Sequence, residues 1–433
     1  MLQLPADSQN IKLGPEQEAA LRELEQGRPG RFVYITGRAG TGKSTLLREF
    51  VAGTRLNTIV LAPTGLAAIQ VGGQTIHSFF LFPFGPLTNN TEDIPKFKRG
   101  HPRNRLINRL DCIVIDEVSM VRADILDAID YSLRINTECD KPFGGKTIIA
   151  FGDIRQLEPV VQEGADRQMI EERFSSAFFF DSLVLKETGI DIWQLETVYR
   201  QRDQEYLWAL EKLRMGNVTE LGYFNERVGQ KLQSRNTVNL TATNARADSI
   251  NMKHLAQLSG VPRIYRGETE GKFERDFPAD PILSLKPGAQ VMFVKNGKEW
   301  SNGTIGQVVQ LEEGEVTVEL ESGGRVQVSR EKWEKTRYTW DSYNSKIEKE
   351  VIGQYMQLPL RLAWAVTIHK SQGLTLESAI VDLDRPAFAH GQVYVALSRC
   401  RTIEGLSLVR AIKPEDIVVN ERVAEFESKA KLV

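Results

Sequence analysis

Short apolar runs alternate with stretches of helical spacing along the first part of the chain. The apolar runs at residues 31–36, 58–62, 112–117 and 146–151 predict buried strands. Apolar residues with helical periodicity predict helices at about 15–25, from 44, after 65 and at 123–137. Strands that alternate with helices indicate a doubly wound parallel sheet, whose ligands bind at the carboxyl ends of the strands.

A second alternation begins near residue 190. Its predicted strands lie at 192–195, 238–241, 379–383 and 406–409, and its predicted helices lie at 204–215 and 245–258. Between about 260 and 353 the pattern changes to short strands at 291–294, 307–311, 315–320 and 325–328, separated by Asn-Gly and Gly-Gly turns. That change predicts an inserted antiparallel β module, a small barrel.

The predicted fold class is therefore α/β, with two parallel-sheet domains and one small inserted β-barrel. We expect the first domain to span residues 1–185 and the second to comprise 186–259 and 354–433, with the barrel at 260–353. The segment from 81 to about 105 is turn-rich and basic, which predicts an exposed excursion from the first domain.

The amino-acid composition limits the kinds of binding partner and the cellular compartment that are expected for this chain. The 433 residues carry 55 Lys+Arg against 57 Asp+Glu, so any nucleic-acid contact must use a local groove rather than a basic coat. Three scattered cysteines exclude a disulfide framework and disfavour a zinc site. The sequence shows neither a signal-peptide layout nor an apolar run long enough to cross a bilayer, so a cytoplasmic protein without membrane contact is expected.

The first candidate site is a glycine-rich loop between a predicted strand and a predicted helix. Residues 37–44 fit the phosphate-binding pattern of Gly, four residues, then Gly-Lys-Ser. In such a loop the backbone N–H groups and the helix N-terminus bind an oxyanion, Lys43 reaches the β and γ phosphates, and Ser44 ligates Mg²⁺. An incidental glycine-rich turn is the alternative, but strand, loop and helix all agree on a nucleoside triphosphate site.

Three further groups suit the same chemistry. Asp116 and Glu117 end an apolar strand, where Asp116 can hold the Mg²⁺ shell and Glu117 can activate water; acidic residues also end strands merely to reach solvent. Gln156 follows the next strand and is a candidate sensor of the γ-phosphate or the attacking water, or a residue of an ordinary polar loop. Arg200 and Arg399, both assigned to the second domain, can stabilise the transferring phosphoryl group across an interdomain cleft, although structural arginines are common.

A dense polar run at 367–373 ends a helix-like stretch. Its hydroxyls, amide and backbone N–H groups suit phosphate contacts of a nucleic-acid strand, and an ordinary helix C-cap at Gly373 is compatible with this role.

Six ordered motifs give the chain a family resemblance that runs almost from end to end. They are GRAGTGKST (37–45), APTGLAAIQVGGQTIHSF (62–79), IDEVSMV (115–121), FGDIRQLEPV (151–160), VTIHKSQGLTL (366–376) and YVALSRCR (394–401). Together with the signature-like segment 124–145, they resemble the PIF-one family of 5′-to-3′ DNA helicases, in the RecD-like branch of superfamily one. The resemblance implies two RecA-like domains, a small wedge near 77–105 and a Src-homology-3-like barrel at 260–353.

The resemblance also implies roles for individual residues. Gln17 would read adenine, Tyr199 would stack near the base, Gln156 would couple the γ-phosphate to the DNA site, and Arg200 and Arg399 would be arginine fingers. The nucleotide-binding set is completed by Gly37, Gly40, Thr41, Gly42, Lys43, Ser44, Thr45 and Gly373. Residues implied to line the single-strand channel are Pro63, Thr64, His77, Phe79, Thr243, Asn244, Thr367, His369, Lys370 and Ser371. Phe79 or Trp364 would stack on bases, but both could equally be core residues, and a core position is the favoured interpretation for Trp364.

The activity that the resemblance implies is ATP- and Mg²⁺-dependent movement along single-stranded DNA in the 5′-to-3′ direction, with unwinding of duplexes, G-quadruplexes and RNA–DNA hybrids. The chain lacks the long terminal extensions of the family's eukaryotic members, which predicts a bacterial or phage-type protein. A monomer in the absence of DNA is also expected. An RNA-directed helicase or remodeller with the same core remains an alternative, because phosphate contacts do not distinguish sugars. A nucleotide-switched DNA-binding protein is a second alternative, but it would have little use for Glu117, Gln156 and two arginines together.

Overall fold

The computed structural model describes residues 13–429 except 89–93, 200–202, 233–235, 274–276, 342, 345, 385 and 388. Among these residues, parallel strands form a first sheet in the order β3-β2-β4-β5-β1-β6. The strands are β1 (Phe32–Gly37), β2 (Thr58–Ala62), β3 (Gln74–Thr75), β4 (Cys112–Ile115), β5 (Thr147–Phe151) and β6 (Asp191–Leu195). We call this sheet and its helices the first region.

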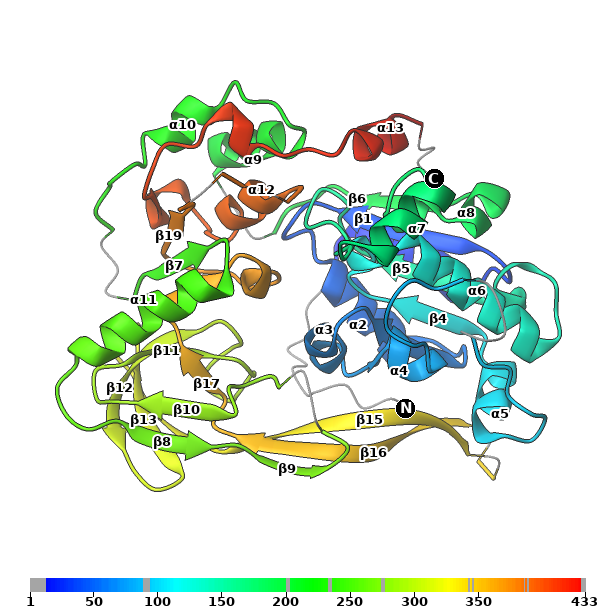
Figure 1. Cartoon of the computed structure of the whole chain (residues 1–433), viewed down its shortest axis with the longest axis horizontal. Coiled ribbons are helices and arrows are strands. Elements are labelled where there is room, and N and C mark those ends of the chain that lie inside the picture. The colour runs from blue at the N-terminus through cyan, green and yellow to red at the C-terminus, as the bar shows by residue number, and fades with distance from the viewer. Residues whose placement is uncertain are drawn as a thin grey trace.

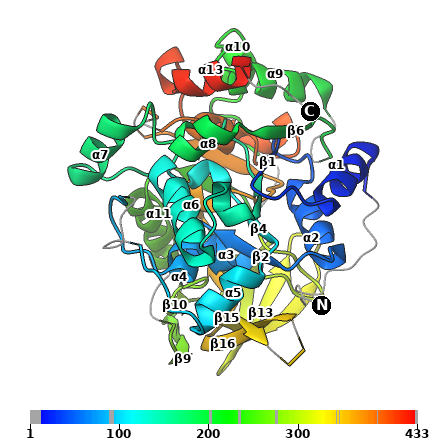
Figure 2. The same ribbon diagram turned by 90° about the vertical axis from the view of Figure 1, so that its right-hand side faces the viewer.

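Helices cover both faces of the first sheet, as the continuous apolar runs require. They are α1 (Pro15–Glu25), α2 (Lys43–Gly53), α3 (Gly65–Gln70), α4 (Ile76–Phe80), α5 (Pro102–Arg109), α6 (Ala123–Thr137), α7 (Ala165–Arg173) and α8 (Leu183–Thr188). Alternate residues of β1 face opposite cores: Val33 packs with α1 and α2, whereas Tyr34 packs with α6. Figure 2 shows these two sets of helices on opposite sides of the sheet.

Strand β6 belongs to the first sheet, whereas the sequence analysis places residues 192–195 with the second alternation. Val33 pairs with Asp191 and Gly37 with Leu195, in parallel register with β1. The segment that follows β6 therefore starts beside the phosphate-binding loop, which itself follows β1.

The predicted excursion is anchored to the first region. Lys96, Lys98 and Arg99 are exposed, as their charge predicts. Leu87 and Ile94, however, are buried in the core of this region, and residues 89–93 between them lie outside the described residues.

The second region is a parallel sheet in the order β18-β7-β19-β20 with its helices. Its elements are β7 (Val238–Thr241), β18 (Ala365–Thr367), β19 (Ala379–Asp382), β20 (Leu406–Leu408), α9 (Gln204–Arg214), α10 (Leu221–Asn225), α11 (Asn244–Gln257) and α12 (Gln392–Leu397). The polar run near 370 does not end a helix, as the sequence suggested: it follows strand β18 as a single 3-10 turn, η4 (His369–Ser371). Its apolar neighbours are buried because they lie in a strand of the sheet.

The β region inserted between α11 and β18 is antiparallel, as predicted. Its strands are β8 (Arg263–Arg266), β9 (Glu268–Gly271), β10 (Ile282–Leu285), β11 (Gln290–Phe293), β12 (Ile305–Leu311), β13 (Glu315–Leu320), β14 (Arg325–Ser329), β15 (Glu331–Asp341), β16 (Lys346–Gln357) and β17 (Leu360–Leu362). Pairing of β17 with β11 carries the antiparallel pattern past residue 353, to Leu362. The two parallel sheets and this insert confirm the predicted α/β fold class.

Two segments join parts that are distant in sequence (Figure 1). The long hairpin of β15 and β16 leaves the β region and lies along the first region, where the Tyr338 hydroxyl is bonded to the backbone of Val60. Helix α13 (Glu421–Lys429) follows the second region but packs on the first. Within the described residues, no helix is long and apolar enough to span a membrane.

Candidate active site

A cleft of about 810 Å³ lies between the first and second regions. It is lined from the first region by Ala39, Gly40, Gly42, Lys43, Ser44, Thr45, Glu117, Gln156 and Tyr199, and from the second by Gly373, Thr375, Arg399, Arg401 and Thr402. The first set comes from loops that follow β1, β4, β5 and β6, neighbouring strands whose carboxyl ends meet at one edge of the sheet. Its volume falls in the range of ligand pockets.

The loop after β1 has the geometry of an anion-binding turn. Gly42, at φ 80°, adopts the left-handed conformation and is followed directly by helix α2, whose first residue is Lys43. The Lys43 ammonium donates to the carbonyls of Gly37 and Arg38 at 2.6 and 3.0 Å. Thr41 is buried and its hydroxyl donates to Arg38, which closes the turn. Ser44 and Thr45 thus stand at a helix N-terminus that faces the cleft.

Gln17 supports this loop from helix α1. Its side-chain amide donates to the carbonyls of Thr41 and Gly42 at 3.2 and 3.3 Å and accepts from the Gly14 N–H at 2.9 Å. The structure therefore places Gln17 against the loop; reading of adenine stays a prediction. Tyr199 lies near Gln17, beside Gly14 and Gly42; its N–H donates to the Gly40 carbonyl, and the residue is 53% exposed, so that part of the ring is open for stacking.

Two carboxylates stand at the end of β4. Burial raises the pKa of Asp116 to about 6, against the opposing effect of Lys43. Burial and the neighbouring Asp116 charge raise the pKa of Glu117 to about 7, although Lys43 and Arg399 oppose that rise. A carboxylate with a pKa near neutrality is suited to accept a proton. Among the described residues, no cluster of three or more His, Cys, Asp or Glu side chains is arranged to hold a metal ion.

Gln156 lies at the centre of a hydrogen-bond network that crosses the cleft. Its Nε2 donates to Asp153 Oδ2 at 3.2 Å. From the second region, Gln372 Nε2 donates to Glu117 Oε2 at 3.0 Å and to Gln156 Oε1 at 3.4 Å. One amide therefore joins both candidate groups of the hydrolytic reaction to the segment that follows η4.

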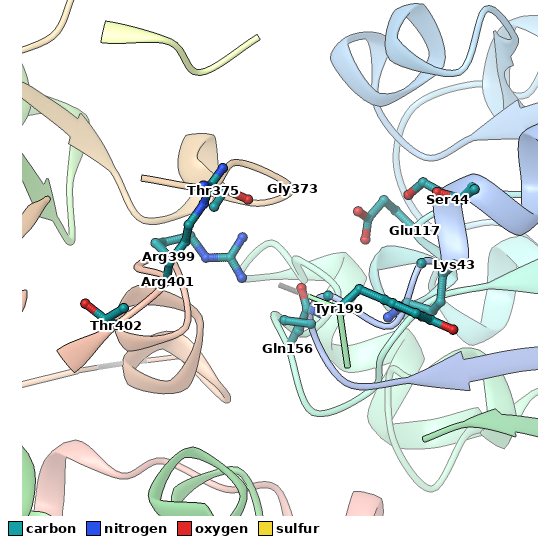
Figure 3. Close-up of a pocket in the computed structure, with 14 residues that line it drawn as sticks. Lys43, Ser44, Glu117, Gln156, Tyr199, Gly373, Thr375, Arg399, Arg401 and Thr402 are labelled. Carbon is teal, nitrogen blue, oxygen red and sulfur yellow. The ribbon is translucent and has the colours of Figure 1, made fainter. Parts of the chain in front are cut away.

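Arg399 comes from the segment after α12 and points across the cleft toward Glu117 and Gln156 (Figure 3). Its guanidinium donates to the carbonyls of Val395 and Ser371 at 2.8 and 3.2 Å. The structure thus brings Arg399 to the cleft that holds the phosphate loop. Arg200 lies outside the described residues, so its predicted role is not placed.

The predicted DNA-contact residues gather at loops after corresponding strands of the two sheets. Thr64 caps α3 after β2 and Thr243 caps α11 after β7, with Pro63 and Asn244 beside them. His369 and the exposed Lys370 lie in η4. Thr367 and Ser371 are buried, and their hydroxyls bond the Lys370 N–H and the Ile368 carbonyl within that turn. Thr367 and Ser371 would therefore contribute to a channel indirectly, by holding the backbone of the turn in its conformation.

For Phe79 the structure favours the alternative of a core residue over a stacking role. Phe79 is 2% exposed, with its ring against Phe80 and Tyr338, so it presents no free face on which a base can stack. Phe84, which the sequence analysis passed over, is 82% exposed and its ring stacks on His77 at 5.4 Å. Trp364 stacks on His254.

Several cleft residues were not selected from sequence. Thr375, Arg401 and Thr402 line the cleft from the second region, and Gln372 bridges it. Gln372 and Arg401 lie within two of the six motifs, so membership of a motif is the sequence signal that could have identified them as functional residues. The sequence analysis assigns the amide of the 367–373 run, which is that of Gln372, to phosphate contacts of a nucleic acid, whereas in the structure this amide donates to Glu117 and Gln156. These cleft contacts depend on how the two regions meet, which no local pattern predicts.

Comparison with known proteins gives one consistent family. A model described as PIF1-like helicase matches residues 12–220. The ATP-dependent DNA helicase Pif1 of Bdellovibrio bacteriovorus is 34% identical over 431 residues, which span 96% of this chain and 92% of that protein. The structure of Bacteroides Pif1 with ADP-AlF4 has a TM-score of 0.87 at 36% identity over 97% of each chain. Bacteroides Pif1 bound to single-stranded DNA, 37% identical over the same 97% of each chain, has a TM-score of 0.70.

Proposed function

Because this chain belongs to the PIF1-like helicase family and is an ATP-dependent DNA helicase, we propose that it moves 5′ to 3′ along single-stranded DNA and separates the duplex ahead of it. The observation that supports ATP-driven movement is the composition of the cleft: Lys43 and Glu117 come from the first region and Arg399 from the second. A site divided in this way is completed when the regions approach, so hydrolysis is coupled to their relative motion. The direction is supported by the family resemblance alone.

The chemistry assigned to each side chain follows from its position. The loop N–H groups and Lys43 bind the phosphates, and Glu117 accepts the proton of the attacking water. Gln156, 3.4 Å from the amide of Gln372, senses the γ-phosphate or that water and passes its position to the second region. Arg399 stabilises the charge that develops on the transferring phosphoryl group.

Mg²⁺ is proposed as the cofactor, held by Ser44 and Asp116. The Ser44 hydroxyl at the start of α2 and the Asp116 carboxylate after β4 are oxygen ligands of the kind that Mg²⁺ prefers. Burial destabilises the charged form of Asp116 and raises its pKa to about 6. A bound cation would stabilise that charged form, so Asp116 fits the role of a metal ligand. The ion would neutralise phosphate charge during transfer.

DNA is proposed to run over the loops after β2, β7 and β18, at the edges of both sheets. Thr64 and Thr243 cap helices whose free N–H groups suit phosphates, and Lys370 adds an exposed positive charge. We further propose activity on G-quadruplexes and RNA–DNA hybrids, a monomer in the absence of DNA and a cytoplasmic location. The family resemblance supports the activities on G-quadruplexes and RNA–DNA hybrids, and the proposed location rests on the sequence, which shows no signal-peptide layout.

Polarity is tested with partial duplexes that carry a 5′ or a 3′ single-stranded tail. Unwinding of the 5′-tailed substrate alone is expected, and Lys43→Ala should abolish it while leaving some DNA binding. Equal unwinding of the 3′-tailed substrate contradicts the direction, and unwinding by Lys43→Ala contradicts the assignment of the cleft.

The class of nucleic acid is tested by ATPase stimulation. Single-stranded DNA should stimulate ATP turnover more than RNA of the same sequence. The reverse order favours an RNA-directed remodeller with the same core. Stimulated turnover without unwinding of any tailed duplex favours the nucleotide-switched binding protein.

A further inference from the structure

The C-terminal helix of the described chain returns to the first region after the second region is complete. Helix α13 buries Val423 fully in the core of the first region, and Phe426 stacks on Phe180 with ring centroids 4.3 Å apart. Arg422 donates to Asp181 at 2.6 Å. Figure 1 shows the segment crossing from one region to the other. The helix is therefore a strap that is anchored on the region carrying the phosphate loop.

One acidic residue of this strap enters a cluster of buried charges. Glu427 Oε2 accepts from Arg155 Nε and Nη2 at 3.0 and 2.7 Å, and Glu427 Oε1 lies 3.8 Å from Arg214 Nη2. The Arg155 and Arg214 side chains are 2% and 9% exposed. A buried guanidinium is strongly destabilised when its partner is removed, so Glu427 has a large influence on where both arginines lie.

The cluster continues to Gln156 through Asp153. Arg214 Nη2 and the Arg155 N–H donate to Asp153 Oδ1 at 3.0 and 3.1 Å, and Gln156 Nε2 donates to Asp153 Oδ2 at 3.2 Å. Burial raises the pKa of Asp153, but Arg214 and Lys43 outweigh it and hold that pKa below its usual value. The carboxylate is therefore charged and fixes the Gln156 amide on one side and Arg214 of the second region on the other.

The backbone of the same loop is held by two further contacts. His390 Nε2 donates to the Ile154 carbonyl at 2.9 Å, while its Nδ1 accepts from the Asn420 N–H at 3.0 Å, which defines the neutral tautomer. Gly391, at φ 71°, packs against the carbonyls of Arg155 and Gln156 too closely for any side chain. The loop at 153–156 is thus clamped between the second region and the strap.

We propose that Glu427 is a positioning residue for ATP hydrolysis. Through Arg155, Arg214 and Asp153 it sets the orientation of Gln156 in the cleft, although it touches neither nucleotide nor DNA. The inference rests on the proposed role of Gln156 toward the γ-phosphate or attacking water. It assigns the strap to the catalytic cycle rather than to stability alone.

The test compares Glu427→Gln with Glu425→Gln on the same helix. Glu425 is exposed and pairs with Arg422, so its substitution makes the same chemical change outside the cluster. DNA-stimulated kcat should fall roughly 2- to 30-fold in Glu427→Gln, the span measured for residues that act through a network. The KM for ATP and the Kd for single-stranded DNA should stay close to wild type. The Tm of Glu427→Gln should fall because a buried arginine loses its charged partner, so kcat is compared at a temperature at which circular dichroism shows every variant to be folded. Glu425→Gln should behave as wild type throughout.

A double-mutant cycle with Gln156→Ala separates positioning from support of the fold. If Glu427 acts through Gln156, Glu427→Gln should cause little further loss of kcat in the Gln156→Ala background. An equal loss in both backgrounds, an unchanged kcat, or a loss that partial unfolding accounts for contradicts the inference. Full turnover in Gln156→Ala alone contradicts the proposed role of Gln156 instead, which keeps the two failures distinct.

Discussion

Glu117 combines a strained backbone with a carboxyl group that is poised near neutrality. Its φ of 51° is in the left-handed region, which costs a residue with a Cβ about 1 to 3 kcal/mol. Its pKa is raised to about 7, chiefly by burial, and Gln372 donates to it at 3.0 Å. Strain of this kind persists where the surrounding structure fixes a group for its chemistry. These three features distinguish Glu117 from an acidic residue that only ends a strand.

Glu117→Gln should therefore remove the proton acceptor while keeping shape and hydrogen bonds. We expect kcat of the DNA-stimulated ATPase to fall by about 10² to 10⁴. Binding of a fluorescent ATP analogue should be retained, because Lys43 and the loop are unchanged. Single-turnover hydrolysis and equilibrium binding measure the two effects, with Glu49→Gln on the exposed face of α2 as the control. Wild-type turnover in Glu117→Gln excludes its role as base.

The residues of the cleft were predictable to different degrees. Lys43, Ser44, Glu117 and Gln156 follow buried strands within short motifs, so local sequence places them at one edge of a parallel sheet. Gln372 reaches Glu117 across 255 positions of sequence, and no local pattern encodes that contact.

At the level of elements, whether a segment forms a helix or a strand was easier to predict than the elements with which it pairs or packs. Strand β6 has the apolar pattern of a strand in either sheet, and its pairing with β1 decides its membership. The residues of β18 are few and buried, so periodicity does not separate a short strand from a buried helix. In the segment around α4, several aromatic residues lie close in sequence, and only the packing of the folded chain shows which of them is exposed.

That distribution of aromatic residues gives opposite expectations for two substitutions. Phe79→Ala should lower the free energy of unfolding by about 3 to 5 kcal/mol, because a fully packed ring leaves a cavity. Phe84→Ala should leave stability almost unchanged and weaken binding of single-stranded DNA, because the exposed ring on His77 is the one free to stack. Urea unfolding and fluorescence anisotropy measure these effects. Normal stability in Phe79→Ala contradicts the packing role of Phe79, and unaltered DNA affinity in Phe84→Ala contradicts the stacking role of Phe84.

At the level of the whole molecule, the β region is tied to the first region by the β15–β16 hairpin. The Tyr338 hydroxyl accepts from the Val60 N–H at 3.1 Å and donates to the Val60 carbonyl at 3.3 Å. Arg109 lies over the ring of Trp340 at 5.3 Å. Tyr338 is buried in the core of the first region, and Trp340 and Ile347 pack against that core. Lys349 donates to the Gly72 carbonyl. Repositioning the β region relative to the first region therefore requires these hairpin contacts to break.

Single-stranded DNA is expected to change this arrangement, whereas nucleotide alone is not. The present structure matches the ADP-AlF4 complex of Bacteroides Pif1 closely, and it matches the DNA-bound form less well although the aligned share of the chain is the same. Equal coverage with a lower TM-score indicates that parts have moved relative to one another. The β region is the candidate that we test, because the β15–β16 hairpin holds it to the first region by non-covalent contacts that can be broken.

Energy transfer between one dye on the first region and one on the β region measures the movement of the β region relative to the first region. Glu25→Cys on α1 and Glu313→Cys in the β12–β13 turn are exposed labelling positions, and Cys139→Ser removes the partly exposed native thiol while Cys112 and Cys400 are buried. Single-stranded DNA should change the transfer efficiency, and ADP-AlF4 should not. A pair within the first region, Glu25→Cys with Lys186→Cys, should respond to neither. Constant transfer in the first pair under saturating DNA, with binding verified by anisotropy, shows that the β region keeps its position; a change with ADP-AlF4 alone shows that nucleotide moves it.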